Sequence, residues 1–220
     1  MGTSERRERE KQQRKQDIIN AAEKVFFSKG YDLATMDDVA HESELSKGTL
    51  YLYFKSKEEL YFAIILRAMK VLHDEFDKTV VGAKNGIDKV RSKGIAYIRF
   101  SRNYPNYFNA LLYYESMKID VEKIRKEYNY QDDIRVAAFH ESDKTTEKLA
   151  EYIQEGIEDG SIRDDIDPQK IAFFLWGAST GLLQLTSHKG HCINKVHNVD
   201  IDEYMEYFMD FLGKCLQKQK

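Results

Sequence analysis

The sequence predicts an all-α protein, and three observations lead to that fold class. Proline occurs only twice in 220 residues. Lys, Glu, Ala, Leu and Ile dominate long stretches, and most of these residues favour helices. No stretch of useful length alternates between apolar and polar residues as a half-buried strand would. We therefore expect a small N-terminal three-helix domain over residues 1–60 and a larger helical domain over residues 61–220.

The first predicted helix runs from about Lys11 to Lys29. Apolar residues such as Ile18, Ala22 and Val25 recur there at helical spacing. Gly30 follows in the position where many helices end.

Three capping patterns then follow at short intervals, each with a Ser or Thr that can accept a backbone hydrogen bond at a helix start. Thr35 precedes a helix from Met36 to about Glu42, with Asp38 as the acidic partner of a capping box. Ser46 precedes a third helix over Lys47–Tyr53, and Ser56 opens a fourth that carries Leu60, Ile64 and Ala68. Three helix starts this close together predict a compact helical unit.

The rest of the chain also reads as helices. Apolar residues share one face over 87–101, Pro105 opens a segment through Met117, and a charged helix spans about 120–158 with a break expected near Asn129 or Ser142. Asp167 and Pro168 form an N-cap and first position for a helix to about Ser187. Residues 189–199 look like a loop, and Asp200 caps the last helix.

Charge is distributed unevenly. The net charge is −3 and the pI is about 6.1, which argues mildly against a nucleic-acid partner. Residues 1–15, however, hold six basic and three acidic residues (+3), and residues 43–57 hold three basic and one acidic residue (+2). On charge alone, these patches are equally compatible with nucleic-acid binding and with a frayed solvated arm and an ordinary surface.

Other sequence features limit where the protein is located and which cofactors it binds. The two cysteines are too few for a disulfide framework, and no stretch reads as a secretory signal or a membrane span, so we expect a cytoplasmic protein. His188, His191, Cys192 and His197 lie close together but lack a standard zinc spacing, and we expect neither a metal nor a cofactor.

Residues 35–57 read as a helix-turn-helix, in which the second helix enters the major groove of DNA. Ser46, Lys47, Gly48 and Thr49 form the first turn of that helix, where backbone N–H groups favour phosphate. Gly48 costs about 1 kcal/mol of helix stability relative to alanine, which makes sense if the backbone must approach a partner closely. The remaining contacts expected are phosphate bonds from Tyr51 and Tyr53, a base contact from Thr49 and a backbone clamp from Lys57. The alternative is a plain three-helix bundle with Tyr51, Tyr53 and Phe54 as core aromatics.

The string SKGTLYLYFKSKEEL, preceded by TMDDVA, resembles the N-terminal domain of TetR-family transcriptional regulators over about residues 14–62. The resemblance implies that Thr35, Lys47, Gly48, Thr49, Tyr51, Tyr53 and Lys57 contact DNA, mostly its backbone. It also implies that Leu50 and Phe54 hold the recognition helix onto the other two helices. The sequence departs from the family pattern at Glu44-Leu45 in the turn, where similar proteins often have a small residue or glycine before a valine.

The same resemblance implies a homodimeric, ligand-responsive repressor that binds a palindromic operator in double-stranded DNA, with no membrane partner. The apolar helix over Asp167–Ser187 and the apolar stripe on the last helix are the candidates for the dimer seam. The alternative is that both stripes face only the internal core.

The middle of the chain carries a candidate pocket for a small-molecule effector, made by Tyr97, Tyr104, Phe108, Tyr114, Glu115 and Trp176. Aromatic residues at helical spacing are more often core, so both interpretations stay open. Glu115 could attract a cationic effector.

Two further function classes remain. The first is a helical sensor or carrier of small molecules that does not bind DNA. An enzyme is the least supported class, because the sequence contains no nucleophile–base pair, no Gly-rich phosphate loop after a strand and no HExxH motif.

Overall fold

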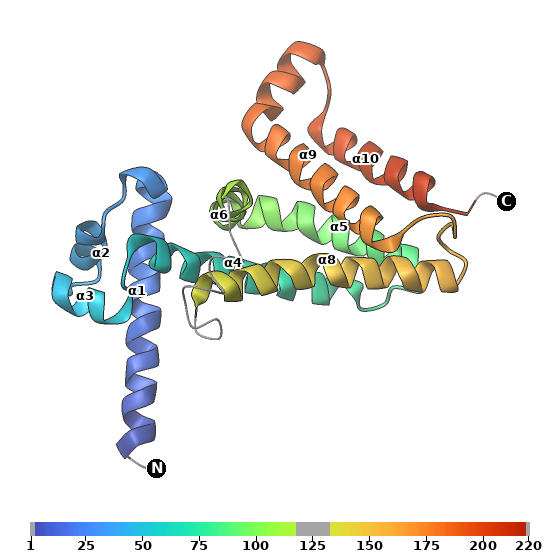
Figure 1. The fold of residues 1–220 in the computed structure, drawn as a ribbon. Helices are drawn as coiled ribbons and strands as arrows, with labels where there is room; N and C mark the ends of the chain where they lie inside the picture. Colours follow the sequence, from blue (N-terminus) through green and yellow to red (C-terminus); the bar gives the residue numbers. More distant parts are fainter. Residues whose placement is uncertain (1–2, 118–132, 219–220) are drawn as a thin grey trace. The chain divides into compact units, whose positions relative to one another are not determined.

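The computed structural model describes residues 3–117 and 133–218, and within these ranges it contains helices and no strands. The all-α prediction is confirmed (Figure 1). The helices are α1 (Thr3–Leu33), α2 (Met36–Glu42), α3 (Lys47–Tyr53), α4 (Lys57–Val80), α5 (Gly86–Asn103), α6 (Pro105–Ser116), α8 (Ile134–Glu158), α9 (Pro168–His197) and α10 (Ile201–Leu216). None of these described helices is long and apolar enough to cross a membrane.

The chain divides into two compact units. Unit 1 comprises Met1–Ala68 and Met117–Phe139, and unit 2 comprises Met69–Ser116 and His140–Lys220. The boundary between the two units at Ala68 and Met69 falls within α4, because this helix continues without interruption from Lys57 to Val80.

Unit 1 is built around apolar side chains from α1 to α4. Ile18, Val39 and Leu60 are fully buried, and the ring of Phe26 meets that of Tyr61 edge-on with centroids 5.2 Å apart. The predicted caps of α2 and α3 are both present, since Thr35 and Ser46 accept hydrogen bonds from the backbone three residues later. These caps fix where each short helix begins.

α1 is longer than predicted at its N-terminal end. The helix begins at Thr3, eight residues before the expected start at Lys11. Side-chain pairs four residues apart support this exposed extension, including Arg6–Glu10 at 2.8 Å and Gln12–Glu8 at 3.0 Å. At the other end, Gly30 interrupts the helical backbone with a φ of 77°, a left-handed conformation that suits glycine.

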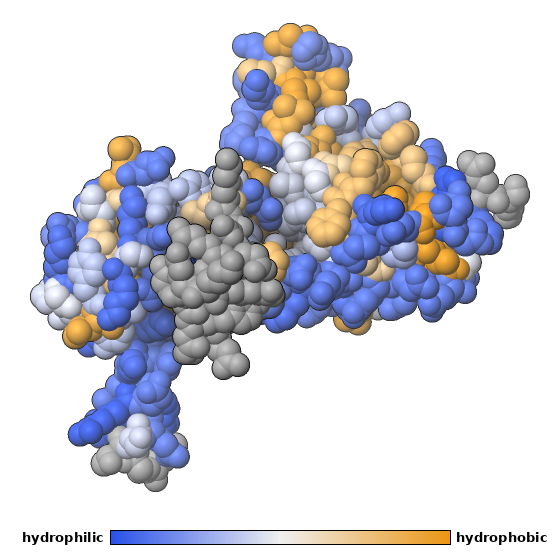
Figure 2. All heavy atoms as spheres, in the orientation of Figure 1, coloured by the Kyte–Doolittle hydropathy of each residue, from blue (hydrophilic) through white to orange (hydrophobic). Residues whose placement is uncertain are grey.

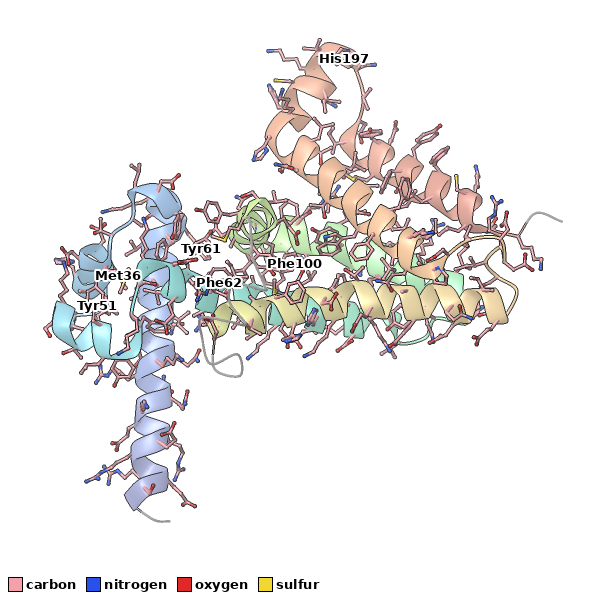
Figure 3. All side chains as sticks on the ribbon, viewed as in Figure 1. Met36, Tyr51, Tyr61, Phe62, Phe100 and His197 are labelled. Carbon is pink, nitrogen blue, oxygen red and sulfur yellow. The ribbon has the colours of Figure 1, made fainter. Side chains whose placement is uncertain are left out.

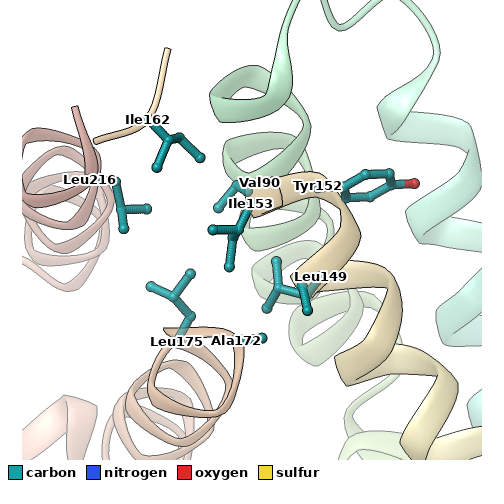
Figure 4. Packing of buried hydrophobic residues seen from close by; sticks show 9 residues of the cluster. Val90, Leu149, Tyr152, Ile153, Ile162, Ala172, Leu175 and Leu216 are labelled. Atoms are coloured by element: carbon teal, nitrogen blue, oxygen red, sulfur yellow. The ribbon is translucent and has the colours of Figure 1, made fainter. Parts of the chain in front are cut away.

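Unit 2 has its core where α5, α8, α9 and α10 meet (Figure 4). The cluster consists of Val90, Leu149, Ala150, Tyr152, Ile153, Ile162, Ala172, Leu175 and Leu216. Two glycines let the start of α5 approach the end of α8 closely. A Cβ on Gly86 would lie 2.1 Å from the backbone nitrogen of Gly156, so no larger residue fits without moving a helix.

Two predicted segments need correction. Residues 189–199 were expected to form a loop, and this prediction is wrong because α9 continues to His197. The helix tolerates Gly190, which packs near Ile201, and it ends at Asn198, whose φ of 53° gives a left-handed cap. α8 is continuous through Ser142, and the break expected near Asn129 lies outside the described residues.

Candidate nucleic-acid interface and ligand cavity

α3 presents one exposed face and one buried apolar face. Leu50 and Phe54 are completely buried, which confirms that these two residues hold the helix onto unit 1. Lys47 and Gly48 are exposed, and Tyr51 is 36% exposed (Figure 3). A recognition helix needs this arrangement, because its outer face must remain free for DNA while its inner face is fixed.

The first turn of α3 is ordered by Ser46. Its Oγ accepts a hydrogen bond from the backbone nitrogen of Thr49 at 3.1 Å and lies 2.8 Å from the Thr49 hydroxyl. Gly48 has open space around it, since a Cβ would meet only Ser46 Oγ, at 3.9 Å. Packing within the chain therefore gives no reason for glycine at this position.

Lys47 is paired with an acidic neighbour on α2. Its Nζ lies 2.7 Å from Asp37 Oδ1, and both side chains are more than half exposed. The hydrogen bond to Asp37 raises the pKa of Lys47, which keeps this lysine positively charged.

Thr35 caps α2 through a reciprocal set of hydrogen bonds. Its Oγ1 accepts from Asp38 N at 3.1 Å, and its backbone nitrogen donates to Asp38 Oδ2 at 3.0 Å. Hydrogen bonds from Lys29 and then from Thr35 lower the pKa of Asp38 to about 2. Thr35 is exposed, but its hydroxyl donates to Asp38 Oδ2 at 2.9 Å, so it would have to release Asp38 before it could donate to a phosphate.

Lys57 has an internal role that sequence reasoning missed. Its Nζ donates to the carbonyl oxygens of Tyr31 at 2.8 Å, Asp32 at 3.3 Å and Ala34 at 3.0 Å. The ammonium also lies 4.4 Å from the centroid of the Tyr31 ring. Because an ammonium has three donors, this conformation leaves none for a phosphate. Lys57 therefore positions the turn between α1 and α2.

The turn before α3 contains the position where the sequence departs from the family pattern. Glu44 has a φ of 54°, a left-handed conformation that disfavours side chains with a Cβ. Hydrogen bonds from Glu44 N to His41 O and from Leu45 N to Ala40 O close the turn. At position 44 the sequence therefore has glutamate where similar proteins often have a small residue or glycine, but the backbone keeps a conformation that suits glycine.

Unit 1 has two further exposed surfaces, one on α3 and one on α1. Leu52 is 75% exposed on α3, although the sequence had given no reason to select it, and apolar side chains in the major groove contact thymine methyl groups. On α1, Arg7, Lys11 and Arg14 are exposed at a spacing of four and three residues, so they form one stripe. We call these three residues the α1 stripe. Lys15 beside it lies 5.4 Å from the ring centroid of Phe54 at the end of α3.

Unit 2 contains an apolar cavity. Of the six residues predicted to line an effector pocket, Tyr97 and Trp176 line this cavity, and their rings stack with centroids 5.1 Å apart. Tyr104, Phe108, Tyr114 and Glu115 do not line this cavity. Phe108 is almost completely buried and packs against Tyr97, as the core alternative proposed.

The cavity wall also contains residues that the sequence did not single out. They come from α4, α5, α8, α9 and α10, and include Phe76, Val90, Lys93, Leu149, Leu175, Met209 and Leu212. These residues lie too far apart in the chain for spacing alone to bring them together.

The histidine and cysteine residues near the end of α9 lie on a helix. The part of the chain that the structure describes contains no group of three or more His, Cys, Asp or Glu residues that could hold a metal ion.

Comparison with known proteins places the helix-turn-helix in a family. The sequence model for "Bacterial regulatory proteins, tetR family" matches residues 18–64. The chain is 49% identical over 55 residues to the uncharacterized HTH-type transcriptional regulator YfiR of Bacillus subtilis, covering 25% of this chain and 27% of YfiR. It is 27% identical over 165 residues to the uncharacterized HTH-type transcriptional regulator YhgD of the same organism, covering 74% of this chain and 78% of YhgD.

The fold of the whole chain is also similar to solved structures. The crystal structure of AibR in complex with isovaleryl coenzyme A and operator DNA aligns with a TM-score of 0.66 and 18% identity, over 90% of this chain and 97% of AibR. The family match covers the same residues that form the exposed, ordered α3 and its supporting helices. Residues 18–64 therefore form a DNA-binding domain of the kind found in the TetR family of bacterial transcriptional regulators.

Proposed function

We propose that this chain is a ligand-responsive repressor that binds a palindromic operator as a homodimer and acts by binding rather than by catalysis. The observation that carries the proposal is the exposed face of α3, presented by a helix whose other face is completely buried. Ser46, Lys47, Gly48, Thr49, Tyr51 and Tyr53 are the proposed DNA contacts, with Thr35 at the start of α2. Lys57 is retained as a positioning residue only.

We assign residues 1–60 to DNA binding and residues 61–220 to effector binding and dimerisation. The division between the two compact units near Ala68 supports this assignment. AibR, which has a similar fold, was crystallised with both a coenzyme A ester and operator DNA, and this supports a protein that responds to a ligand.

Dimerisation through α9 and α10 is supported by their exposed apolar side chains. Among the described residues, six of the ten exposed large apolar side chains lie on these two helices, and Figure 2 shows apolar surface over them. They are Phe173, Phe174, Leu185, Val196, Tyr207 and Phe211. Apolar surface of this kind marks an interface, and a two-fold axis would pair the helices from both copies.

The test is a titration of the protein with duplexes that it selects from a random pool. We expect Lys47→Ala combined with Tyr51→Ala to weaken binding. The slope of log K against log salt should also fall by about one unit for each phosphate that the variant no longer neutralises. The matched control is Lys84→Ala, which removes an exposed lysine from unit 2.

Two results would contradict the proposal. If no duplex is enriched, the carrier without DNA binding becomes the better interpretation. If the double variant binds as tightly as the unaltered protein while circular dichroism shows the same helicity, α3 is not the reading helix.

A further inference from the structure

Lys93 on α5 is a buried cation. It is 5% exposed, and among the described residues it is the one buried side chain that carries a formal charge. Its Nζ donates to the backbone oxygen of Thr145 on α8 at 2.6 Å. The rings of Phe76 and Tyr152 have their centroids 4.8 Å and 6.0 Å from the ammonium.

This ammonium lacks an anionic partner in the described part of the chain. The ion pairs found there within 4.0 Å do not include Lys93, and its hydrogen bond goes to a neutral carbonyl. Buried charges are usually paired because removal from water is costly. Burial, followed by the charge of Lys148, lowers the pKa of Lys93 to about 8, so the side chain is still mostly protonated at neutral pH.

Lys93 lies in the wall of the apolar cavity of unit 2. Its neighbours in the wall include Leu149, Leu175 and Trp176. Lys93 and Phe76 also line a second, more polar hollow beside His73, Asp77, Lys148 and Glu151. The side chain of Lys93 therefore lies between an apolar space and a polar one, with its ammonium near Thr145 and Tyr152 of the polar hollow.

Arg91 is the other basic residue in the cavity wall, and it differs from Lys93 in its pairing. The guanidinium of Arg91 lies 2.8 Å from Asp210 Oδ1, so its charge is already balanced. Of the two cations, Lys93 is the one without an ion pair within 4.0 Å among the described residues, and the charges of Asp77 and Glu151 act on it from farther away.

We propose that this cavity binds an elongated apolar carboxylate, with its hydrocarbon part against Leu149, Leu175 and Trp176 and its carboxylate paired with the ammonium of Lys93. This assignment rests on the proposed ligand-responsive function and specifies the ligand class. A neutral apolar ligand would leave the buried ammonium without a counter-charge, and a cationic ligand would place a like charge beside it. A carboxylate would form a charge-assisted hydrogen bond with Lys93.

The chain contains its own reporter for this test. Trp176 is the only tryptophan in the sequence, and it lines the cavity. We would titrate the protein, without DNA, with octanoate, octanol and octylamine and follow tryptophan fluorescence. These probes share one chain length and differ in the charge of the head group. We expect octanoate to bind at least about tenfold more tightly than octanol, with octylamine the weakest.

Two variants identify the cation that is responsible. Lys93→Met keeps the length of the side chain and removes its charge, and we expect it to abolish the preference for octanoate over octanol. Arg91→Met removes the paired cation from the same wall and should leave that preference unchanged. Helicity and thermal unfolding of each variant would establish that it is folded.

The proposal is overturned if the unaltered protein binds octanol as tightly as octanoate, or binds neither. It is also overturned if folded Lys93→Met retains the preference. If Lys93→Met does not fold, the proposal is tested by the relative affinities of the three probes for the unaltered protein. A second titration in the presence of operator DNA separates this inference from the proposed function: octanoate binding without any change in DNA affinity would support the site and contradict regulation by it.

Discussion

Gly48 is a helical glycine that packing within the chain does not require, as is also true of Gly177, Gly181 and Gly213. Gly86 faces backbone at 2.1 Å, whereas a Cβ at Gly48 would meet only a serine hydroxyl at 3.9 Å. Glycine also weakens a helix relative to alanine. A residue that lowers helix stability and relieves no crowding within the chain indicates a close approach by something outside it.

We expect Gly48→Ala to raise the free energy of unfolding by about 0.5–1 kcal/mol while weakening DNA binding, because the added methyl group stabilises α3 and obstructs the DNA backbone. Chemical denaturation and a DNA titration would measure the two effects. A variant that is more stable and binds equally well would show that the DNA does not approach α3 at this position.

Asp37 reduces the positive charge that α3 presents. It pairs with Lys47 across exposed surface, so the pair contributes little to stability. We expect Asp37→Asn to strengthen DNA binding several-fold at low salt, with a smaller effect as salt rises, because it removes a negative charge next to the phosphates. Asp164, which forms a similar exposed pair with Lys218 in unit 2, provides the control Asp164→Asn. Equal effects of the two variants would indicate that only net charge matters.

At the scale of elements, unit 2 depends on how closely α5 and α8 approach each other. The backbone nitrogen of Gly86 donates to Asp159 Oδ2 at 2.7 Å, and Ile162 packs against Gly156 from the following connector. A side chain at either glycine would separate elements that share one core.

We expect Gly86→Ala to lower the free energy of unfolding by about 1–3 kcal/mol, the usual effect of overpacking, with a corresponding fall in the melting temperature. Gly48→Ala is the matched comparison, because the same substitution is made where space is available. Similar melting temperatures for both variants would show that the two helices can separate at little cost.

The elements that could be predicted from the sequence are those with local signals. Thr35, Ser46, Asp167 and Asp200 all cap the helices they were expected to cap, because capping depends on a few neighbouring residues. The length of α9 was underestimated, since polar residues and Gly190 resemble a loop unless the contact with Ile201 is known. The internal hydrogen bonds of Lys57 could not be predicted for a related reason, since its three carbonyl partners lie more than twenty positions away in the sequence.

At the scale of the whole molecule, the exposed apolar side chains of α9 and α10 are the main surface that the described chain leaves uncovered. We expect Phe174→Glu combined with Phe211→Glu to yield a monomer with unchanged helicity and weaker operator binding, because a monomer contacts one half-site. Light scattering after size-exclusion chromatography would measure the mass. Val81→Glu changes another highly exposed apolar residue and should leave the oligomeric state unaltered. A dimer that persists in the double variant would place the interface elsewhere.

The cavity belongs to this scale too, because its wall draws on helices from Phe76 to Leu216. Of the aromatic residues that the sequence suggested for a pocket, Tyr97 and Trp176 line the cavity, but spacing could not separate them from neighbours such as Phe108 that fill the core.

The N-terminal extension of α1 has a practical consequence for such measurements. From Thr3 to Asp17 the helix advances about 20 Å, which is the length of roughly six base pairs. We expect the α1 stripe to bind phosphates that flank the operator, and oligonucleotides trimmed to the operator would lack those phosphates. Nuclease protection should accordingly extend several base pairs past each half-site, and affinities measured on short oligonucleotides should underestimate those on flanked ones.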